Sequence, residues 1–295
     1  MVFRMKKVIL LMMVLFCCIG LYPVAFCEQE EILIDEENGL WVYKTDTLSI
    51  EIKRCEDEEE HLRWYECDVI ASPEDPLRVA LSQGKKKEGI TRVAPSKLVA
   101  ENHCVLAISE DYYSYRISKN STVGIIVRNG LIFSEKTYKA GYARLPNLEV
   151  LAVFEDGSMK TFASDAYTAQ EYLDMGATNV FAFGPILVQN GELGEHMQDP
   201  TYYHYREPRM AIGMIEPYHY LIVAVDGRND EENIKGGYLD WLSELMLERG
   251  CVEALNLDGG GTACLMFMGK KLNYTGSSTR SLSSMIYFGT SDQVQ

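Results

Sequence analysis

The run Asn256-Leu257-Asp258-Gly259-Gly260-Gly261-Thr262 follows a mostly apolar stretch, Val252-Glu253-Ala254-Leu255, near the end of the chain. Three consecutive glycines lose much conformational entropy on folding, so they are expected where the backbone needs positive φ or approaches a ligand closely. Asp258 comes directly after a predicted buried strand, where a carboxylate has no packing role. The alternative is a plain glycine-rich turn in which Asp258 is only a turn former. We interpret the run as a functional site.

Several other kinds of site are excluded by what surrounds this run. The Gly-x-x-x-x-Gly-Lys-Ser/Thr pattern of a phosphate-binding loop is absent. An apolar strand, Cys264-Leu265-Met266-Phe267-Met268, follows the glycines where a dinucleotide fingerprint needs a helix. The sequence has no Gly-x-Ser-x-Gly elbow, and its five histidines lack metal-ligand spacing. We therefore expect no cofactor and name no metal ligand; a need for a divalent metal stays open.

Polar residues also follow a second predicted strand. Tyr220-Leu221-Ile222-Val223-Ala224-Val225 leads into Asp226-Gly227-Arg228, and Arg209-Met210-Ala211-Ile212-Gly213 opens another strand. Arginine offers a planar, permanently charged donor fork that suits phosphate or carboxylate. An ordinary Asp-Gly turn at Asp226 and an ion pair at the sheet edge for Arg209 are the alternatives.

The pattern of elements predicts an α/β (α+β) fold with a mixed sheet, several hairpins and two main helices. Hairpins are indicated at Asn129-Gly130, Asp156-Gly157 and Asn190-Gly191, each between apolar stretches. The helices are expected at residues 167–175, capped near Ser164-Asp165, and at residues 239–249. Each is followed by glycine, a buried strand and a tight turn, at Gly184 and at Asp258 respectively. We infer two related units whose turns lie at the same end of a sheet.

The N-terminus is predicted to be an export segment, residues 1–27. Arg4, Lys6 and Lys7 precede an almost wholly apolar stretch, residues 8–26, as in a secretory signal peptide. An uncleaved membrane anchor is the alternative, because the stretch approaches the roughly 20 residues that span a bilayer. In either case the rest of the chain is expected outside the cytoplasm.

Charge limits the partners of the remaining chain. Removal of the export segment changes the net charge from −15 to about −18, because the segment holds three basic and no acidic residues. A nucleic-acid partner is excluded, since such binding needs a basic surface. An anionic substrate remains possible where arginines gather in a cleft. Residues 28–85 are expected to form an N-terminal β unit, in which Cys55 and Cys67 are candidates for a disulfide across a hairpin.

The sequence resembles the phosphodiester glycosidase family in several blocks. These stand here as Phe183-Gly184-Pro185-Ile186-Leu187-Val188, Arg209-Met210-Ala211-Ile212-Gly213, Val225-Asp226-Gly227-Arg228 and the run at 256–262. Val123-Gly124-Ile125-Ile126-Val127-Arg128-Asn129-Gly130, preceded by Asp111-Tyr112-Tyr113, and Arg280-Ser281-Leu282-Ser283-Ser284 also match. Two blocks depart from the family pattern. Ser109 and Glu110 replace the usual Asn and Gly, and Ala263 replaces the second hydroxyl after the glycines.

The resemblance implies a phosphodiester glycosidase domain at residues 90–295, which hydrolyses a sugar-1-phosphodiester at the glycosidic C1–O bond. Asp258, and with it Asp226, is expected to be catalytic. Arg209, Arg228 and Arg280 are expected to hold the phosphate. The remaining expected substrate-binding residues are Asn256, Gly259, Gly260, Gly261, Thr262, Gly184 and Asp111. Two alternatives stay open: a glycosidase or transferase acting on cell-envelope polysaccharide without a phosphodiester, and a non-catalytic envelope-binding module.

Overall fold

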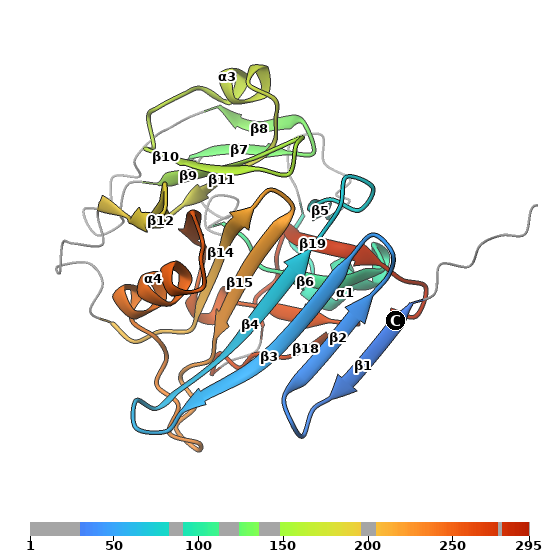
Figure 1. Ribbon diagram of the computed structural model, residues 1–295, viewed down its shortest axis with the longest axis vertical. Helices are drawn as coiled ribbons and strands as arrows, with labels where there is room; N and C mark the ends of the chain where they lie inside the picture. The colour runs from blue at the N-terminus through green and yellow to red at the C-terminus, as the bar shows by residue number, and fades with distance from the viewer. Residues whose placement is uncertain are drawn as a thin grey trace, which may run out of the picture.

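The computed structural model describes residues 30–82, 91–111, 124–135, 148–195, 205–276 and 279–294, which form three β-sheets (Figure 1). The nine-stranded sheet has the order β1 (Glu31–Asp35), β2 (Leu40–Lys44), β3 (Ser49–Asp57), β4 (Leu62–Ile70), β15 (His219–Val225), β14 (Arg209–Glu216), β16 (Glu253–Asn256), β12 (Ile186–Gln189) and β13 (Glu192–Leu193). The β9 sheet has the order β10 (Met159–Phe162), β9 (Glu149–Phe154), β11 (Ala177–Phe183), β7 (Ile125–Arg128) and β8 (Leu131–Glu135). The β6 sheet has the order β18 (Lys270–Lys271), β17 (Leu265–Phe267), β6 (Cys104–Ile108), β19 (Ser284–Thr290) and β5 (Arg78–Leu81).

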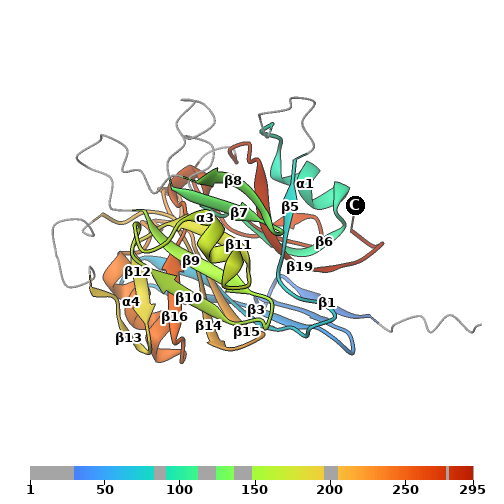
Figure 2. The same cartoon turned by 90° about the horizontal axis from the view of Figure 1, so that it is seen from above.

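Each sheet carries one described α-helix on its outer face (Figures 1 and 2). Helix α4 (Leu239–Glu248) packs on β12 of the nine-stranded sheet, α3 (Ala169–Asp174) on β11, and α1 (Pro95–Glu101) on β6. The inner faces of all three sheets share a central core, to which Ile212, Phe181 and Leu106 each contribute. The three sheets therefore pack against one another through their inner faces. Residues just beyond the strand ends on one side of this core can lie close together.

Strand β15 shows why some strands read as continuous apolar runs. Successive side chains of a strand point to opposite faces. Ile222 and Ala224 enter the central core, while Val223 and Val225 pack in the separate core under α4. A strand covered on both faces has no solvent face, so the alternation of apolar and polar residues disappears.

The expected combination of strands and helices is found, although strands dominate. The three Asn-Gly and Asp-Gly hairpins are confirmed as β7–β8, β9–β10 and β12–β13. The expectation of mixed pairing was wrong for the described strands, whose hydrogen-bonded pairs are all antiparallel. Eight of the sixteen described pairs join consecutive strands through turns of two to four residues, and such short turns require antiparallel neighbours.

Two further expectations need correction. Helix α3 begins after Thr168, not near Ser164, because the Thr168 hydroxyl and the Glu171 carboxylate form a reciprocal capping box. The two helix–strand–turn units do not share a sheet, since β11 lies in the β9 sheet and β16 in the nine-stranded sheet. Their turns nevertheless meet, as described below.

The N-terminal strands continue the nine-stranded sheet through the pairing of β4 with β15. Cys55 lies opposite Trp64 and Cys67 lies opposite Ile52, so the two cysteines are not cross-strand neighbours, and both are free thiols. Residues 1–29, which hold the expected export segment, lie outside the described residues. Within the ranges that the structure describes, no helix has the length and apolar character needed to cross a membrane.

Candidate active site

The two strands that precede Asp226 and Asp258, β15 and β16, have their C-terminal ends on the same side of the nine-stranded sheet. β14 lies between β15 and β16 and is antiparallel to both, so β15 and β16 run in the same direction. Val225 pairs with Arg209 on one side of β14, and the Leu257 amide donates to the Met210 carbonyl oxygen on the other (2.8 Å). Asp226 and Asp258 therefore flank the start of β14, two strand spacings or roughly 10 Å apart along the sheet.

Residues 258–262, the glycine loop, leave the sheet through a close approach to Pro208. The Gly260 amide donates to the Pro208 carbonyl oxygen (2.8 Å), and a Cβ at Gly259 would lie 2.5 Å from that same oxygen. Gly260 has a φ of +58°, in the region that favours glycine, before the turn η2 (Gly260–Thr262). These two glycines are required by the path of the loop.

Two guanidinium groups lie against the glycine loop. An atom at the Cβ position of Gly260 would lie 3.2 Å from Nη2 of Arg228, and Arg280 Nη1 donates to the Thr262 hydroxyl (3.2 Å). Arg280 is exposed, and the Arg228 side chain is 44% exposed and anchored by Glu207, whose Oε2 lies 2.8 Å from Nε and 2.6 Å from Nη2. The loop is therefore bordered by positive charge that remains accessible to an anion.

Arg209 is bound more firmly to the protein itself. Its Nε donates to the Gly237 carbonyl oxygen (3.1 Å) and its Nη2 to the Tyr205 carbonyl oxygen (2.6 Å). Burial lowers the pKa of Arg209 to about 10; Glu207 opposes this shift and Arg228 adds to it. At neutral pH Arg209 remains a cation, but much of its donor fork supports the backbone around the site.

Asp226 is a buried carboxyl group with few compensating contacts. Its Oδ1 accepts from the Tyr274 amide (2.7 Å), and Nη1 of Arg63 lies 4.0 Å from its Oδ2. Burial raises the pKa of Asp226 to about 7, against the opposing effects of the Tyr274 amide, Arg63 and Lys271. The group therefore keeps its proton to a much higher pH than an ordinary aspartic acid does.

Asn256 joins the turn at Gly184 to the glycine loop. Its Nδ2 donates to the Gly184 carbonyl oxygen (2.9 Å), and the Gly184 amide donates to the Asn256 carbonyl oxygen (3.1 Å). Gly184 has a φ of +98°, and a Cβ there would lie 3.2 Å from the Cβ of buried Glu149. Oδ1 of Asn256 is buried and has no hydrogen-bond partner among the described residues.

Asp111 lies in a buried charge cluster rather than at an open surface. Its Oδ2 lies 3.0 Å from Nη2 of Arg128 and accepts from the Ala182 amide (3.1 Å). Glu110 contacts the same guanidinium through Oε2, 2.9 Å from Nε, and its carbonyl oxygen accepts from the Asp258 amide (2.9 Å). The cluster therefore contacts the first residue of the glycine loop through the backbone of Glu110.

The structure brings the sequence-predicted residues to one region, and it adds others that the sequence did not single out. Arg128 precedes an Asn-Gly turn, where a charged residue is expected to be exposed to solvent. In the structure it is fully buried. Glu149 and Glu207 carry no local signal at all, because their roles depend on segments distant in the chain. The one sequence signal for Arg128 was an arginine at the end of the otherwise apolar stretch Ile125-Ile126-Val127. The full set at this edge is Asp226, Asp258, Arg209, Arg228, Arg280, Asn256, Gly184, Gly259, Gly260, Gly261, Thr262, Glu110, Asp111, Arg128, Glu149 and Glu207.

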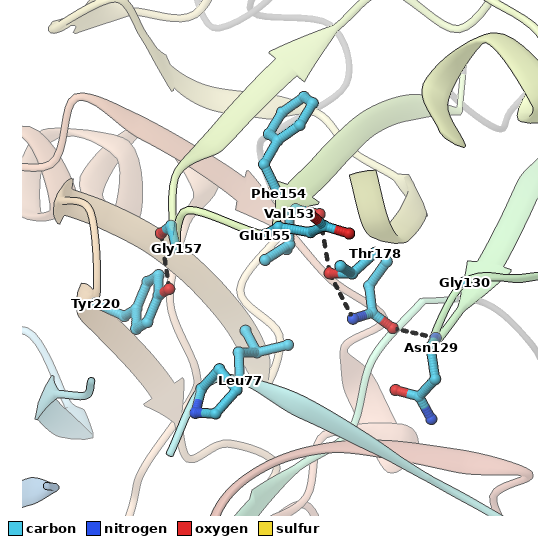
Figure 3. Close-up of a pocket in the computed structure, with 11 residues that line it drawn as sticks. Leu77, Asn129, Gly130, Val153, Phe154, Glu155, Gly157, Thr178 and Tyr220 are labelled. Atoms are coloured by element: carbon cyan, nitrogen blue, oxygen red, sulfur yellow. Dashed lines mark hydrogen bonds between the residues drawn. The ribbon is translucent and has the colours of Figure 1, made fainter. Parts of the chain in front are cut away.

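A cavity of about 420 Å³ lies elsewhere, among the turns of the β7–β8 and β9–β10 hairpins (Figure 3). The Asn129 side chain pairs with the backbone of Val79, and the Asn179 Oδ1 accepts from the Asn129 amide (2.8 Å). The Tyr220 hydroxyl donates to the Gly157 carbonyl oxygen (2.7 Å). These polar groups already bond to the protein, and none of the sequence-predicted site residues lines the cavity. It therefore provides no rival site for the predicted chemistry.

The chain is similar to known proteins in sequence and in fold. A family model described as phosphodiester glycosidase matches residues 102–289, which include the glycine loop and both strand ends. An SPbeta prophage-derived protein, YomE of Bacillus subtilis, is 30% identical over 157 residues. The match covers 53% of this chain but only 23% of that relative, so the chain spans less than a quarter of its length.

Two solved structures share the fold. The zebrafish N-acetylglucosamine-1-phosphodiester alpha-N-acetylglucosaminidase catalytic domain, auto-inhibited by its pro-peptide, superimposes with a TM-score of 0.62 at 16% identity. That match covers 89% of this chain and 91% of the zebrafish chain. A hypothetical protein from Synechocystis superimposes with a TM-score of 0.53 at 14% identity, over 83% of this chain and 62% of that one. At these identities the likeness is one of fold.

Proposed function

Because this chain belongs to the phosphodiester glycosidase family, we propose that it is an exported hydrolase that cleaves a sugar-1-phosphodiester at the glycosidic C1–O bond. The observation that carries the proposal is the glycine loop, with a carboxylate at its start and two arginines against it. Asp258 opens the loop, Arg228 lies at Gly260, and Arg280 binds Thr262. A carboxylate next to accessible cations fits a substrate in which an anomeric carbon is joined to a phosphate.

Asp258 is assigned to the anomeric carbon. Cleavage of a glycosidic bond passes through an oxocarbenium-like transition state, which carries positive charge at C1. A fixed carboxylate stabilises that charge, or it removes a proton from the attacking water. Asn256 lies at the end of the same strand, and its buried Oδ1 has no hydrogen-bond partner among the described residues. We therefore expect the sugar to bind above the start of the glycine loop.

The phosphate is assigned to the arginines. Arg228 and Arg280 present accessible guanidinium groups, whose planar forks match phosphate oxygens. The amides of Gly260 and Thr262 already donate to the carbonyl oxygens of Pro208 and Gly259, so these amides contribute to the shape of the loop. Arg209 adds positive charge near the loop, while its Nε donates to the Gly237 carbonyl oxygen. Phosphate recognition therefore depends mainly on Arg228 and Arg280.

The leaving group relaxes the demand for acid catalysis. A phosphate monoester leaves with far less protonation than a sugar alcohol does, so a strong general acid is less important than in ordinary glycosidases. We assign Asp226 as the second carboxyl group. Its pKa of about 7, raised by burial, keeps it partly protonated at neutral pH, where it can donate or accept a proton.

The decisive experiment measures release of free sugar from a panel of sugar-1-phosphate methyl esters. We expect equal amounts of free sugar and methyl phosphate from at least one member, and no release by the Asp258→Asn variant. Neutral aryl glycosides of the same sugars form the control panel. Hydrolysis confined to those neutral glycosides would favour an enzyme for envelope polysaccharide without a phosphodiester. Binding to envelope polysaccharide without turnover of either panel would favour a non-catalytic module.

Export is part of the proposal. The positive start and apolar stretch of residues 1–27 are typical of a secretory signal. Expression of the full chain in its host, followed by fractionation and N-terminal sequencing, tests this directly. A new N-terminus close to residue 28 supports cleavage, and an intact N-terminus in the membrane fraction supports anchoring. Recovery in the cytoplasm would contradict export.

A further inference from the structure

Arg128 lies where the three sheets meet, and it is completely buried. It ends β7 of the β9 sheet, while Glu110 and Asp111 follow β6 of the β6 sheet. Its Nε lies 2.9 Å from Glu110 Oε2 and its Nη2 lies 3.0 Å from Asp111 Oδ2. Its Nη1 donates to the carbonyl oxygens of Val127 (2.9 Å) and Val180. One guanidinium thus holds two carboxylates and two strands of the β9 sheet.

The segment that Arg128 holds also anchors both ends of the glycine loop. Before the loop, the Asp258 amide donates to the Glu110 carbonyl oxygen (2.9 Å). After it, the Cys264 amide donates to the Ser109 hydroxyl (3.1 Å), and the Ser109 amide donates to the Cys264 carbonyl oxygen (2.9 Å). Residues 109–111 are therefore the platform on which residues 258–264 rest.

Other contacts of the platform come from the same two sheets. The Ser284 hydroxyl of β19 donates to the Glu110 carboxylate, and the Ala182 amide of β11 donates to Asp111. The Arg128 guanidinium also lies 4.2 Å from the centre of the Phe181 ring. Three nitrogens of one planar guanidinium face two carboxylates and two carbonyl oxygens at once, whereas a lysine ammonium has three donors on a single atom. The geometry of the cluster thus depends on arginine.

We propose that Arg128 is a positioning residue, which through Glu110 and Asp111 sets the platform and thereby places the Asp258 carboxylate against the substrate. This inference rests on the hydrolase activity proposed above. Displacement of a reacting group by about 1 Å can lower a rate by about a hundredfold. A cluster that fixes the backbone at Asp258 therefore acts on the chemical step more than on substrate binding.

The test combines kinetics with local hydrogen exchange in three variants of the full chain. Arg128→Lys keeps the charge but not the fork, and Glu110→Gln keeps the shape but not the charge. The matched control is Glu253→Gln, because Glu253 is an equally buried carboxylate at the opposite end of β16, where it accepts from the Thr161 amide (2.9 Å). All three variants alter the hydrogen bonds of a buried charged group, so all three are expected to lower the melting temperature.

We expect Arg128→Lys to lower kcat by about 10- to 100-fold while KM changes by less than about threefold. Amide exchange in residues 258–264 should become faster in Arg128→Lys and in Glu110→Gln. In Glu253→Gln, kcat and exchange in those residues should match the unmodified chain. A folded Arg128→Lys variant with unchanged kcat and unchanged exchange would overturn the proposal. An equal loss of kcat in Glu253→Gln would also overturn it, because the loss would then reflect general destabilisation.

Two further outcomes keep the test decisive. Where Arg128→Lys does not fold, Glu110→Gln alone decides, and unchanged exchange in residues 258–264 overturns the proposal. Where the unmodified chain releases no sugar from any sugar-1-phosphodiester, the proposed function fails. The positioning role is then judged on exchange in residues 258–264, which does not require turnover.

Discussion

Asp226 and Asp258 occupy corresponding places in the nine-stranded sheet but have different surroundings. Each follows a strand that flanks β14, and the two strands run in the same direction. Both side chains are buried; Asp226 accepts from the Tyr274 amide and has Nη1 of Arg63 4.0 Å from its Oδ2. Asp258 begins a loop of three glycines that has arginines on its border. Position in the sheet brings the two carboxyl groups together, and the residues after each strand determine which chemistry each can perform.

The largest expected effect comes from removing the carboxylate of the glycine loop. Asp258→Asn should lower kcat on a sugar-1-phosphodiester by about a thousandfold or more, because the stabilising charge at C1 is lost. Its melting temperature should remain within a few degrees of the unmodified chain. Asp226→Asn, measured in parallel, should retain more activity. Near-normal turnover by a folded Asp258→Asn variant would show that Asp258 is not the main catalytic carboxylate.

Distortion of the glycine loop should have the next largest effect. Gly260→Val places a branched side chain at a φ of +58° and 3.2 Å from Arg228, so we expect roughly a hundredfold loss of kcat/KM. Gly191 provides a matched control, because it has a φ of +76° but no atom within 4 Å of its Cβ position. Gly191→Val should lower the melting temperature and leave kcat/KM unchanged. Full activity in Gly260→Val would make the loop an ordinary turn.

Arginine replacements test which guanidinium binds the phosphate. Arg228→Lys keeps the charge but loses the fork, and loss of a charge-assisted hydrogen bond costs about 1.5–3 kcal/mol. At about 1.4 kcal/mol per tenfold, kcat/KM on the phosphodiester should fall by roughly ten- to a hundredfold. A neutral aryl glycoside of the same sugar should be affected much less.

Arg209→Lys should behave differently, because Arg209 braces the carbonyl oxygens of Gly237 and Tyr205. We expect it to lower the melting temperature and to weaken turnover of the charged and neutral substrates together. A loss confined to the phosphodiester would instead assign Arg209, and not Arg228, to the phosphate. Kinetics on both substrates, together with thermal unfolding, distinguish these outcomes.

The smallest expected effect is a change in pH dependence at Asp226. Burial raises its pKa from an ordinary 3.8 to about 7, although Arg63, Lys271 and the Tyr274 amide oppose the shift and Glu232 adds to it. The unfolded chain therefore loses this proton at lower pH than the folded protein does. The resulting stability is fully present below about pH 4 and is lost as pH rises towards 7.

Asp226→Asn should remove this loss. We expect the melting temperature of the variant, relative to the unmodified chain, to rise between pH 4 and pH 7 and then to remain level. We also expect kcat of the unmodified chain to decline above about pH 7, as Asp226 loses its proton, and we expect this decline to be absent in the variant. An identical pH dependence in both proteins would show that Asp226 keeps an ordinary pKa.

The local elements were largely predictable because their signals are local. The Asn-Gly and Asp-Gly hairpins, helix α4 and strands β14, β15 and β16 all follow from turn residues and apolar patterns. The order of the strands within the three sheets was not predictable. An apolar strand that is covered on both faces carries no sequence pattern that identifies the strands beside it. For the same reason the two helix–strand–turn units were assigned to one sheet, although they belong to two.

By itself the sequence determined that Asp258 opens a glycine-rich strand end, that Asp226 and Arg209 lie at strand ends, and that the chain resembles the phosphodiester glycosidase family. Only the tertiary structure decided how these residues are used. It placed Arg228 and Arg280 against the glycine loop, committed Arg209 to the backbone, and buried Arg128 between Glu110 and Asp111. The physical reason is that a charge acquires its role from its partners and its burial. Both are set by segments that are distant in the chain and adjacent only after the three sheets have packed on one core.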